Sequence, residues 1–234
     1  MRASLLGEVL ELCDFATFRT LVSISTHADA CIRWCQSQRK WGKSIVKACE
    51  VGDLDFVQWC LQVYQPRFPD VADLVNRDRV VQYTFGLIGA TYGGHIDIAR
   101  LMIAKGAKAG AGAVMVGACW NGDRPMVDLI IAHGNKYWNE GLRTASLRGR
   151  EEIFYLMVSK GATNFNGALN SACTGGHQNM VDLAVQFGAN DWSGGLMGAV
   201  SGKQRAMADL MIARGARITD EARSLWPDLP QPAE

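Results

Sequence analysis

Five alanines in this 234-residue chain recur at intervals of 28, 27, 27 and 27 residues, and each is followed sixteen residues later by a glycine. The alanines are Ala90, Ala118, Ala145, Ala172 and Ala199, and the glycines are Gly106, Gly134, Gly161, Gly188 and Gly215. A fixed period of roughly 20 to 50 residues is the signature of a repeat architecture. The chain must therefore fold as a series of copies of the same structural unit.

Each repeat is predicted to be a helical hairpin. Apolar residues recur at intervals of three and four in its second half, as in Ile96, Ala99 and Ile103, which is typical of an amphipathic helix. A glycine four residues after the alanine separates the two helices, except that Lys203 takes this place in the last repeat and Gly202 precedes it. The closing glycine suits the left-handed conformation that ends many helices. One hairpin cannot bury its own apolar face, so the repeats must stack on one another.

Two further columns of residues belong to the first helix. The position six residues before each alanine is mostly occupied by residue types that are favoured as helix N-caps, and we expect the first helix to begin there. They are Thr84, Gly112, Asn139, Asn166 and Ser193. The position before them is mostly aromatic and holds Trp41, Tyr83, Trp138, Phe165 and Trp192. A partner would rarely present one contact five times, so we expect these rings to pack between repeats.

The repeat register divides the chain into three regions. Residues 42–226 form the array, with a divergent first repeat around Ala48, about six repeats in all, and a C-terminal half-repeat from Thr219 to Trp226. About fifteen extra residues separate the first repeat from the second, and we expect a surface excursion there. Residues 1–40 form an N-terminal helical segment, and residues 227–234 form a proline-rich tail. The expected fold class is all-α.

The run from Gly93 to Ile98 (GGHIDI) and the run KGA at residues 105–107, echoed at residues 175–177 and 160–162, resemble the ankyrin family. They are most similar to the short ankyrin repeats of large DNA viruses of eukaryotes. This resemblance implies a helical-hairpin solenoid over residues 42–226. The family repeat has about 33 residues, and the residues missing here fall where the ankyrin β-finger belongs. We therefore expect tight turns and no β-fingers between the repeats.

Residues 1–40 admit two interpretations. The segment 8–25 is similar to the F-box, a helical module that docks on the small adaptor of cullin ubiquitin ligases. That resemblance implies that the adaptor contacts are Leu10, Phe15, Phe18, Leu21 and Ile24. A helical cap that covers the first repeat would show nearly the same apolar pattern, because terminal repeats need polar covers.

Composition restricts the function classes. The formal charge is only +1, so neither a nucleic-acid footprint nor a polybasic membrane patch dominates. No stretch is apolar for long enough to cross a bilayer. The seven cysteines are scattered, which favours thiols in a reducing compartment, and we expect an intracellular protein of the cytoplasm or nucleus of a host cell. Cys49, Cys119 and Cys173 directly follow repeat alanines, so we expect them to be buried.

Residue types that carry chemistry occur without the spacing that chemistry needs. His27, Cys31 and Cys35 would span roughly 12 Å along a helix, too far for one zinc ion, so we expect no metal site and no cofactor. His95 and His177 share one repeat position and are expected to make a structural hydrogen bond. We expect no enzyme, with an enzyme or small-ligand protein on an ankyrin-like frame as the alternative, which a convergent polar cavity would favour.

The ankyrin resemblance also implies where a partner would bind. In that family the two residues after the paired small residues of the first helix face the concave groove. In three successive repeats these positions place side by side Tyr92, Trp120, Asn121, Leu147 and Arg148. Aromatic and arginine side chains often anchor protein interfaces. We therefore expect a scaffold that binds a host or viral protein, which an F-box at residues 1–40 would make a substrate adaptor; alternatively, Trp120 packs within the array.

Overall fold

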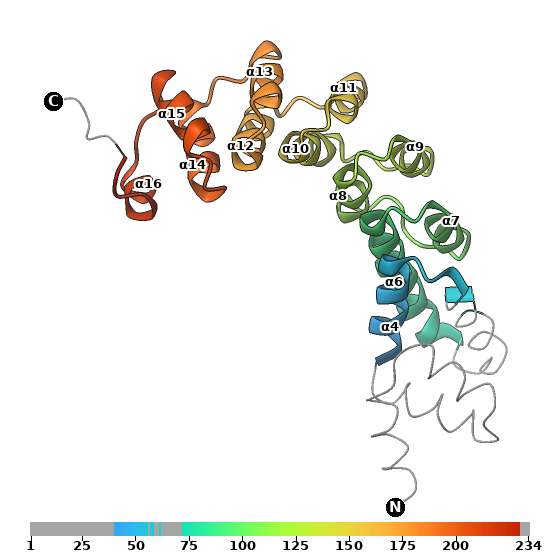
Figure 1. The fold of residues 1–234 in the computed structure, drawn as a ribbon. Coiled ribbons are helices and arrows are strands. Elements are labelled where there is room, and N and C mark those ends of the chain that lie inside the picture. The colour runs from blue at the N-terminus through green and yellow to red at the C-terminus, as the bar shows by residue number, and fades with distance from the viewer. Residues whose placement is uncertain (1–39, 56, 59–60, 62–71, 230–234) are drawn as a thin grey trace, which may run out of the picture. The chain divides into compact units, whose positions relative to one another are not determined.

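The computed structural model describes residues 40–55, 57–58, 61 and 72–229 (Figure 1). Regular structure in these residues is entirely helical, which confirms the all-α prediction for this part of the chain. The described residues divide into two compact units, one that ends at Lys108 and one that begins at Ala109.

The first unit contains α4 (Lys40–Val51), α6 (Ala72–Gly93) and α7 (Ile96–Ala104). Helix α6 packs against both α4 and α7. Its 22 residues begin well before Thr84, where the sequence predicted a helix start. Part of the stretch expected to be a surface excursion is therefore the N-terminal half of α6.

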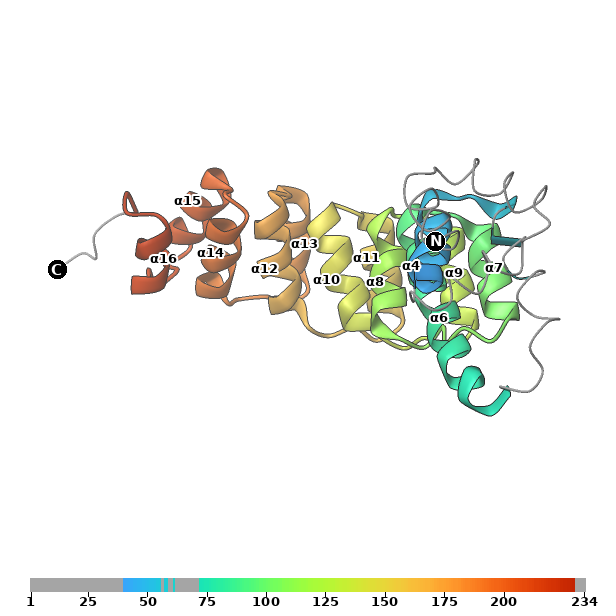
Figure 2. The same cartoon turned by 90° about the horizontal axis from the view of Figure 1, so that it is seen from below.

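The second unit is a row of helix pairs. Its first helices are α8 (Gly112–Trp120), α10 (Trp138–Arg148), α12 (Phe165–Gly175) and α14 (Trp192–Ser201). Its second helices are α9 (Arg124–Ala132), α11 (Glu151–Ser159), α13 (Gln178–Gln186) and α15 (Arg205–Ala213), and α16 (Asp220–Leu225) follows. Each first helix packs against its own second helix and against the next first helix, and α16 packs against α14. Figure 1 shows the two kinds of helix as two layers of this unit, and Figure 2 views the unit from the side of the first helices.

The repeat alanines lie inside the array. Ala118, Ala145, Ala172 and Ala199 are completely buried, as is Ala90 of the first unit. The cysteines that follow alanines in alternate repeats, Cys49, Cys119 and Cys173, are also completely buried, as predicted. Burial raises the pKa of Cys119 to about 12 and that of Cys173 to about 11, so both thiols stay neutral at ordinary pH.

The buried cysteines fit against glycines of the next repeat. A Cβ atom on Gly141 would lie 3.3 Å from Sγ of Cys119 and would overlap Sδ of Met157. Gly195 has the same relation to Cys173, at 3.5 Å, and to Met211. Sulfur atoms therefore fill the space that a side chain would need at these glycines, and this contact recurs in every second repeat.

The closing glycines end the second helices as the sequence predicted. Gly106, Gly134, Gly161, Gly188 and Gly215 all have φ between 87° and 104°. In the repeat of Ala145, the Ala162 amide donates to Met157 O (3.0 Å) and the Gly161 amide donates to Val158 O (2.9 Å). This hydrogen-bond pair is the Schellman motif, which satisfies carbonyls that the helix itself leaves free. In the described residues the connections to the next repeat contain no strand, which confirms the prediction of turns without β-fingers.

The predicted helix N-caps are wrong, because those side chains bond to the next repeat instead. Helices α10, α12 and α14 begin one residue earlier than expected, and Asn164 and Asp191 cap α12 and α14. Oδ1 of Asn139 accepts from the amides of Thr163 (2.9 Å) and Asn164 (3.0 Å). Thr84, Asn166 and Ser193 accept from amides 24 residues further along the chain in the same way. Each of these side chains therefore ties its helix to the following loop.

Gly112 cannot make this tie, and Asn135 replaces it. Asn135 is 1% exposed and occupies a position where the other four repeats have alanine. Its Nδ2 donates to the carbonyls of Ala109 (2.6 Å) and Ala111 (2.9 Å), and its Oδ1 accepts from the Tyr137 amide (3.0 Å). Asn135, in the loop after α9, thus supplies the hydrogen bonds that Gly112 at the start of α8 cannot make.

The aromatic residues that start the first helices were expected to pack between repeats, but two of them make contacts within their own repeat. Phe165 stacks on Phe187 at 5.4 Å, and the guanidinium of Arg214 lies 5.3 Å from the Trp192 ring. Both contacts join the start of a first helix to the end of its own second helix. The ring centroid of Phe187 lies 5.7 Å from that of Phe154 in the preceding repeat. Aromatic packing between these repeats therefore involves Phe187 and not the residue of the aromatic column itself.

Replacing Asn135 by Ala should lower the free energy of unfolding by about 2–3 kcal/mol, because it leaves two carbonyls and one amide without their partner. Urea denaturation followed by circular dichroism measures this loss. Asn190→Ala is the control, since Asn190 is an exposed asparagine of a later loop and should cost less than about 0.5 kcal/mol. Equal effects of the two substitutions would contradict the role of Asn135.

Candidate interaction surface

The predicted partner-binding residues lie where each first helix turns into its second helix. We call these connections the turn edge; in the second unit they are residues 121–123, 149–150, 176–177 and 202–204. At each turn one residue adopts a left-handed conformation, as at Gly122 (φ 74°) and Gly149 (φ 67°). The helix ends there because this conformation directs the chain out of the α-helix.

Side chains of one repeat cover the turn glycine of the repeat before it. A Cβ atom on Gly122 would lie 2.8 Å from Cδ of Arg150, and one on Gly149 would lie 2.9 Å from Nδ1 of His177. Gln204 covers Gly176 similarly. The φ angle of these turns therefore favours glycine, and the side chain packed on each glycine leaves little space for a Cβ atom.

The same position in the first unit holds His95. Nε2 of its ring lies 3.0 Å from the Glu50 carbonyl oxygen. The carbonyl can only accept, so this nitrogen must carry the proton. The predicted structural hydrogen bond is confirmed for His95, and the structure places His177 against Gly149 in the corresponding contact.

Glycines next to the turn restrict which repeats can present side chains. A Cβ atom on Gly175 would overlap the Leu147 carbonyl oxygen, and one on Gly202 would overlap that of Thr174. These repeats have no side chain at the second of the two predicted partner-facing positions. In the second unit, only the ends of α8 and α10 have side chains at both positions, and these are Trp120, Asn121, Leu147 and Arg148.

Trp120 and Arg148 form the centre of this surface. Cζ of Arg148, at the end of α10, lies 4.4 Å from the centroid of the Trp120 ring at the end of α8. Trp120 is half-buried and Arg148 is exposed. A cation over an aromatic face contributes about 0.5–1 kcal/mol at an exposed site. Trp120 therefore packs within the array and still offers part of its surface.

The other predicted residues divide between the two units. Leu147 is half-buried and Asn121 is exposed, next to Arg148 and Trp120 respectively. Tyr92 is 37% exposed and belongs to the first unit. The predicted F-box contacts Leu10, Phe15, Phe18, Leu21 and Ile24 lie outside the described residues.

The sequence prediction missed Arg150. Its side chain begins at the cap of α11 and reaches back to Gly122, just beyond Trp120. The available signal was its register, since it stands five residues after the repeat alanine, as His95, His177 and Gln204 do. Two arginines thus reach the C-terminal end of α8.

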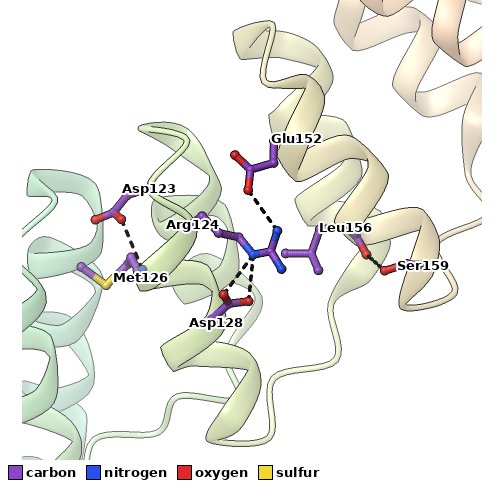
Figure 3. Close-up of polar contacts among 7 residues, drawn as sticks. All are labelled: Asp123, Arg124, Met126, Asp128, Glu152, Leu156 and Ser159. Atoms are coloured by element: carbon purple, nitrogen blue, oxygen red, sulfur yellow. Dashed lines mark hydrogen bonds and ion pairs between the residues drawn. The ribbon is translucent and has the colours of Figure 1, made fainter.

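Arginines on the second helices, unlike Arg148 over its aromatic ring, contact carboxylates. Nε of Arg124 lies 3.0 Å from Asp128, and its Nη1 lies 3.0 Å from Glu152 on the next second helix (Figure 3). The hydrogen bond to Asp128 raises the pKa of the Arg124 guanidinium further. Arg214 contacts Asp182 across α15 and α13 in a similar way (3.5 Å). On this layer the arginines are neutralised by carboxylates of the same chain.

A scan against known protein families finds no match, and a search of curated proteins finds none either. Within the part of the chain that the structure describes, no helix combines the length and apolar character needed to span a bilayer. The same residues contain no cluster of three or more histidine, cysteine, aspartate or glutamate side chains arranged to hold a metal ion.

Lys203 occupies the left-handed position of the last turn, with φ 58°. Lys203→Gly should raise the free energy of unfolding by about 0.5–1 kcal/mol, because relief of the strained backbone exceeds the added entropy of the unfolded chain. Urea denaturation measures the gain. Lys203→Ala is the control, since it removes the charge and keeps the strain, and an equal gain in this variant would contradict the argument.

Proposed function

We propose that this chain is a protein-binding scaffold that holds its partner at the ends of α8 and α10, and that its helix pairs form an ankyrin-type solenoid with shortened repeats. The Trp120–Arg148 contact carries this proposal. The solenoid is supported by first helices that pack each against the next and by second helices in a separate layer.

Physical chemistry favours these side chains as anchors. Tryptophan and arginine are enriched among residues that dominate interface energies. Tryptophan buries a large area for few rotatable bonds, and the planar guanidinium of arginine makes several directed hydrogen bonds. The ring of Trp120 is already held by Arg148, so binding restricts it little further. The glycines of the later repeats leave no comparable side chains at the equivalent positions. The proposed surface uses no residue of the segment 1–40.

The test compares two tryptophans of the second unit. Trp120 and Trp192 are both half-buried under an arginine, but Trp192 starts α14, at the opposite end of the hairpins from the turn edge. Replacing either by Ala should lower the free energy of unfolding by a similar amount, about 2 kcal/mol, because each loses partly buried apolar area as well as its arginine contact. Only Trp120→Ala should weaken partner binding, by at least about 1 kcal/mol.

The partner is first identified by affinity purification from cells that express the chain, with mass spectrometry. Its affinity for the wild type and both variants is then measured with purified proteins by calorimetry. Unchanged affinity of Trp120→Ala, or equal losses in both variants, would show that these helix ends are not the binding surface.

A further inference from the structure

We infer that the partner segment bound at this surface is an acidic peptide whose carboxylates pair with Arg148 and Arg150. This inference rests on the proposed function and names the chemistry of the partner. It starts from two cations that converge on one helix end. Arg148 lies over Trp120, and the stem of Arg150 lies against Gly122, two residues further along the chain.

Both guanidinium groups lack a carboxylate partner in the part of the chain that the structure describes. Within residues 40–55, 57–58, 61 and 72–229, Arg148 and Arg150 form no ion pair with a carboxylate, and both are exposed. Arg124, Arg205 and Arg214 of the same unit each pair with an aspartate. A partner that supplied carboxylates would therefore meet two cations without first breaking an ion pair among the described residues.

The contacts also prepare Arg148 for carboxylate binding. A guanidinium that lies over an aromatic ring is held in place there and keeps its N–H groups for hydrogen bonds. Two parallel hydrogen bonds to one carboxylate are the strongest arrangement such a group makes. The half-buried Leu147 and Trp120 add apolar surface beside these cations, so an acidic segment with an apolar side chain fits best.

A peptide fits the charge of this chain better than a nucleic acid does. Proteins that bind nucleic acid typically neutralise several phosphates, with roughly 6–10 contacts in strong cases. Here two arginines converge, and the formal charge of the whole chain is only +1. The two arginines also lie near the C-terminal end of α8, where cations offset the helix dipole. A purely structural role of this kind is the competing explanation that the experiment must separate.

The experiment selects random peptides displayed on phage against the full chain. Enriched peptides should contain an excess of aspartate and glutamate next to an apolar residue. The most enriched peptide is then synthesised with a fluorophore, and its affinity is measured by fluorescence anisotropy. Arg148→Ala and Arg150→Ala should each weaken binding by about tenfold, as should replacing the peptide carboxylates by amides.

Arg217→Ala is the matched control. Arg217 is an exposed arginine of the same unit in the loop after α15, so its removal changes the net charge equally. It should change the affinity by less than about twofold. Circular dichroism of each variant verifies that the helices remain, and high salt should weaken the wild-type complex because the paired charges are exposed.

Three outcomes would overturn the inference. The first is enrichment of peptides without excess acidic residues, even if their binding depends on Trp120. The second is an equal loss in Arg148→Ala and Arg217→Ala, which an effect of net charge alone would produce, or no loss in either, which a purely structural role of Arg148 would produce. The third is displacement of the peptide by polyuridine RNA, which would indicate a nucleic-acid surface. The proposed scaffold function is judged separately, by the affinity of the purified partner for Trp120→Ala.

Discussion

The close approach of successive first helices is the constraint on which the second unit depends. Cβ atoms built on Gly175, Gly198 and Gly202 would overlap carbonyl oxygens of the preceding first helix, and the neighbouring repeat alanines are completely buried. Helices can meet backbone to backbone only where side chains are this small. This requirement explains why the alanine is the most regular residue of the repeat and why glycines gather around it.

The same constraint limits where a partner can be recognised. Where a glycine contacts the preceding backbone, as Gly175 and Gly202 do, that position of the repeat has no side chain to offer. The chain departs from glycine at Asn121 and Arg148, and there an aromatic ring and a guanidinium come into contact. The second helices carry charges of both signs that pair with each other, as Arg124 does with Asp128 and Glu152. The proposed interaction surface at the ends of α8 and α10 therefore lies where packing leaves part of an aromatic ring and a guanidinium accessible.

Much of this organisation follows from local properties of the chain. The repeat length, the helical hairpin, the left-handed closing glycines and the burial of Cys119 could be predicted, because periodicity and glycine conformation act within a few residues. The exception at Lys203 is instructive. The turn still forms in register there, with a lysine at positive φ, and Gly202 keeps its close contact with Thr174. The predicted pattern held where the preferred residue was absent, since packing of the whole repeat outweighs one strained residue.

Polar side chains, by contrast, could not be assigned from sequence. Asn139, Asn166 and Ser193 are good N-cap types, yet their oxygens accept from amides of the next loop, 24 residues away. An oxygen atom accepts equally well from a local amide and from a distant one, and only the spatial arrangement of the repeats selects between them. Asn135 replaces this hydrogen bond in the repeat of Gly112, and Arg148 and Arg150 converge on α8. Both contacts likewise depend on the spatial arrangement of the repeats. Periodicity and backbone preference thus establish the helices and their buried faces, whereas contacts between repeats depend on distances that exist only in the folded chain.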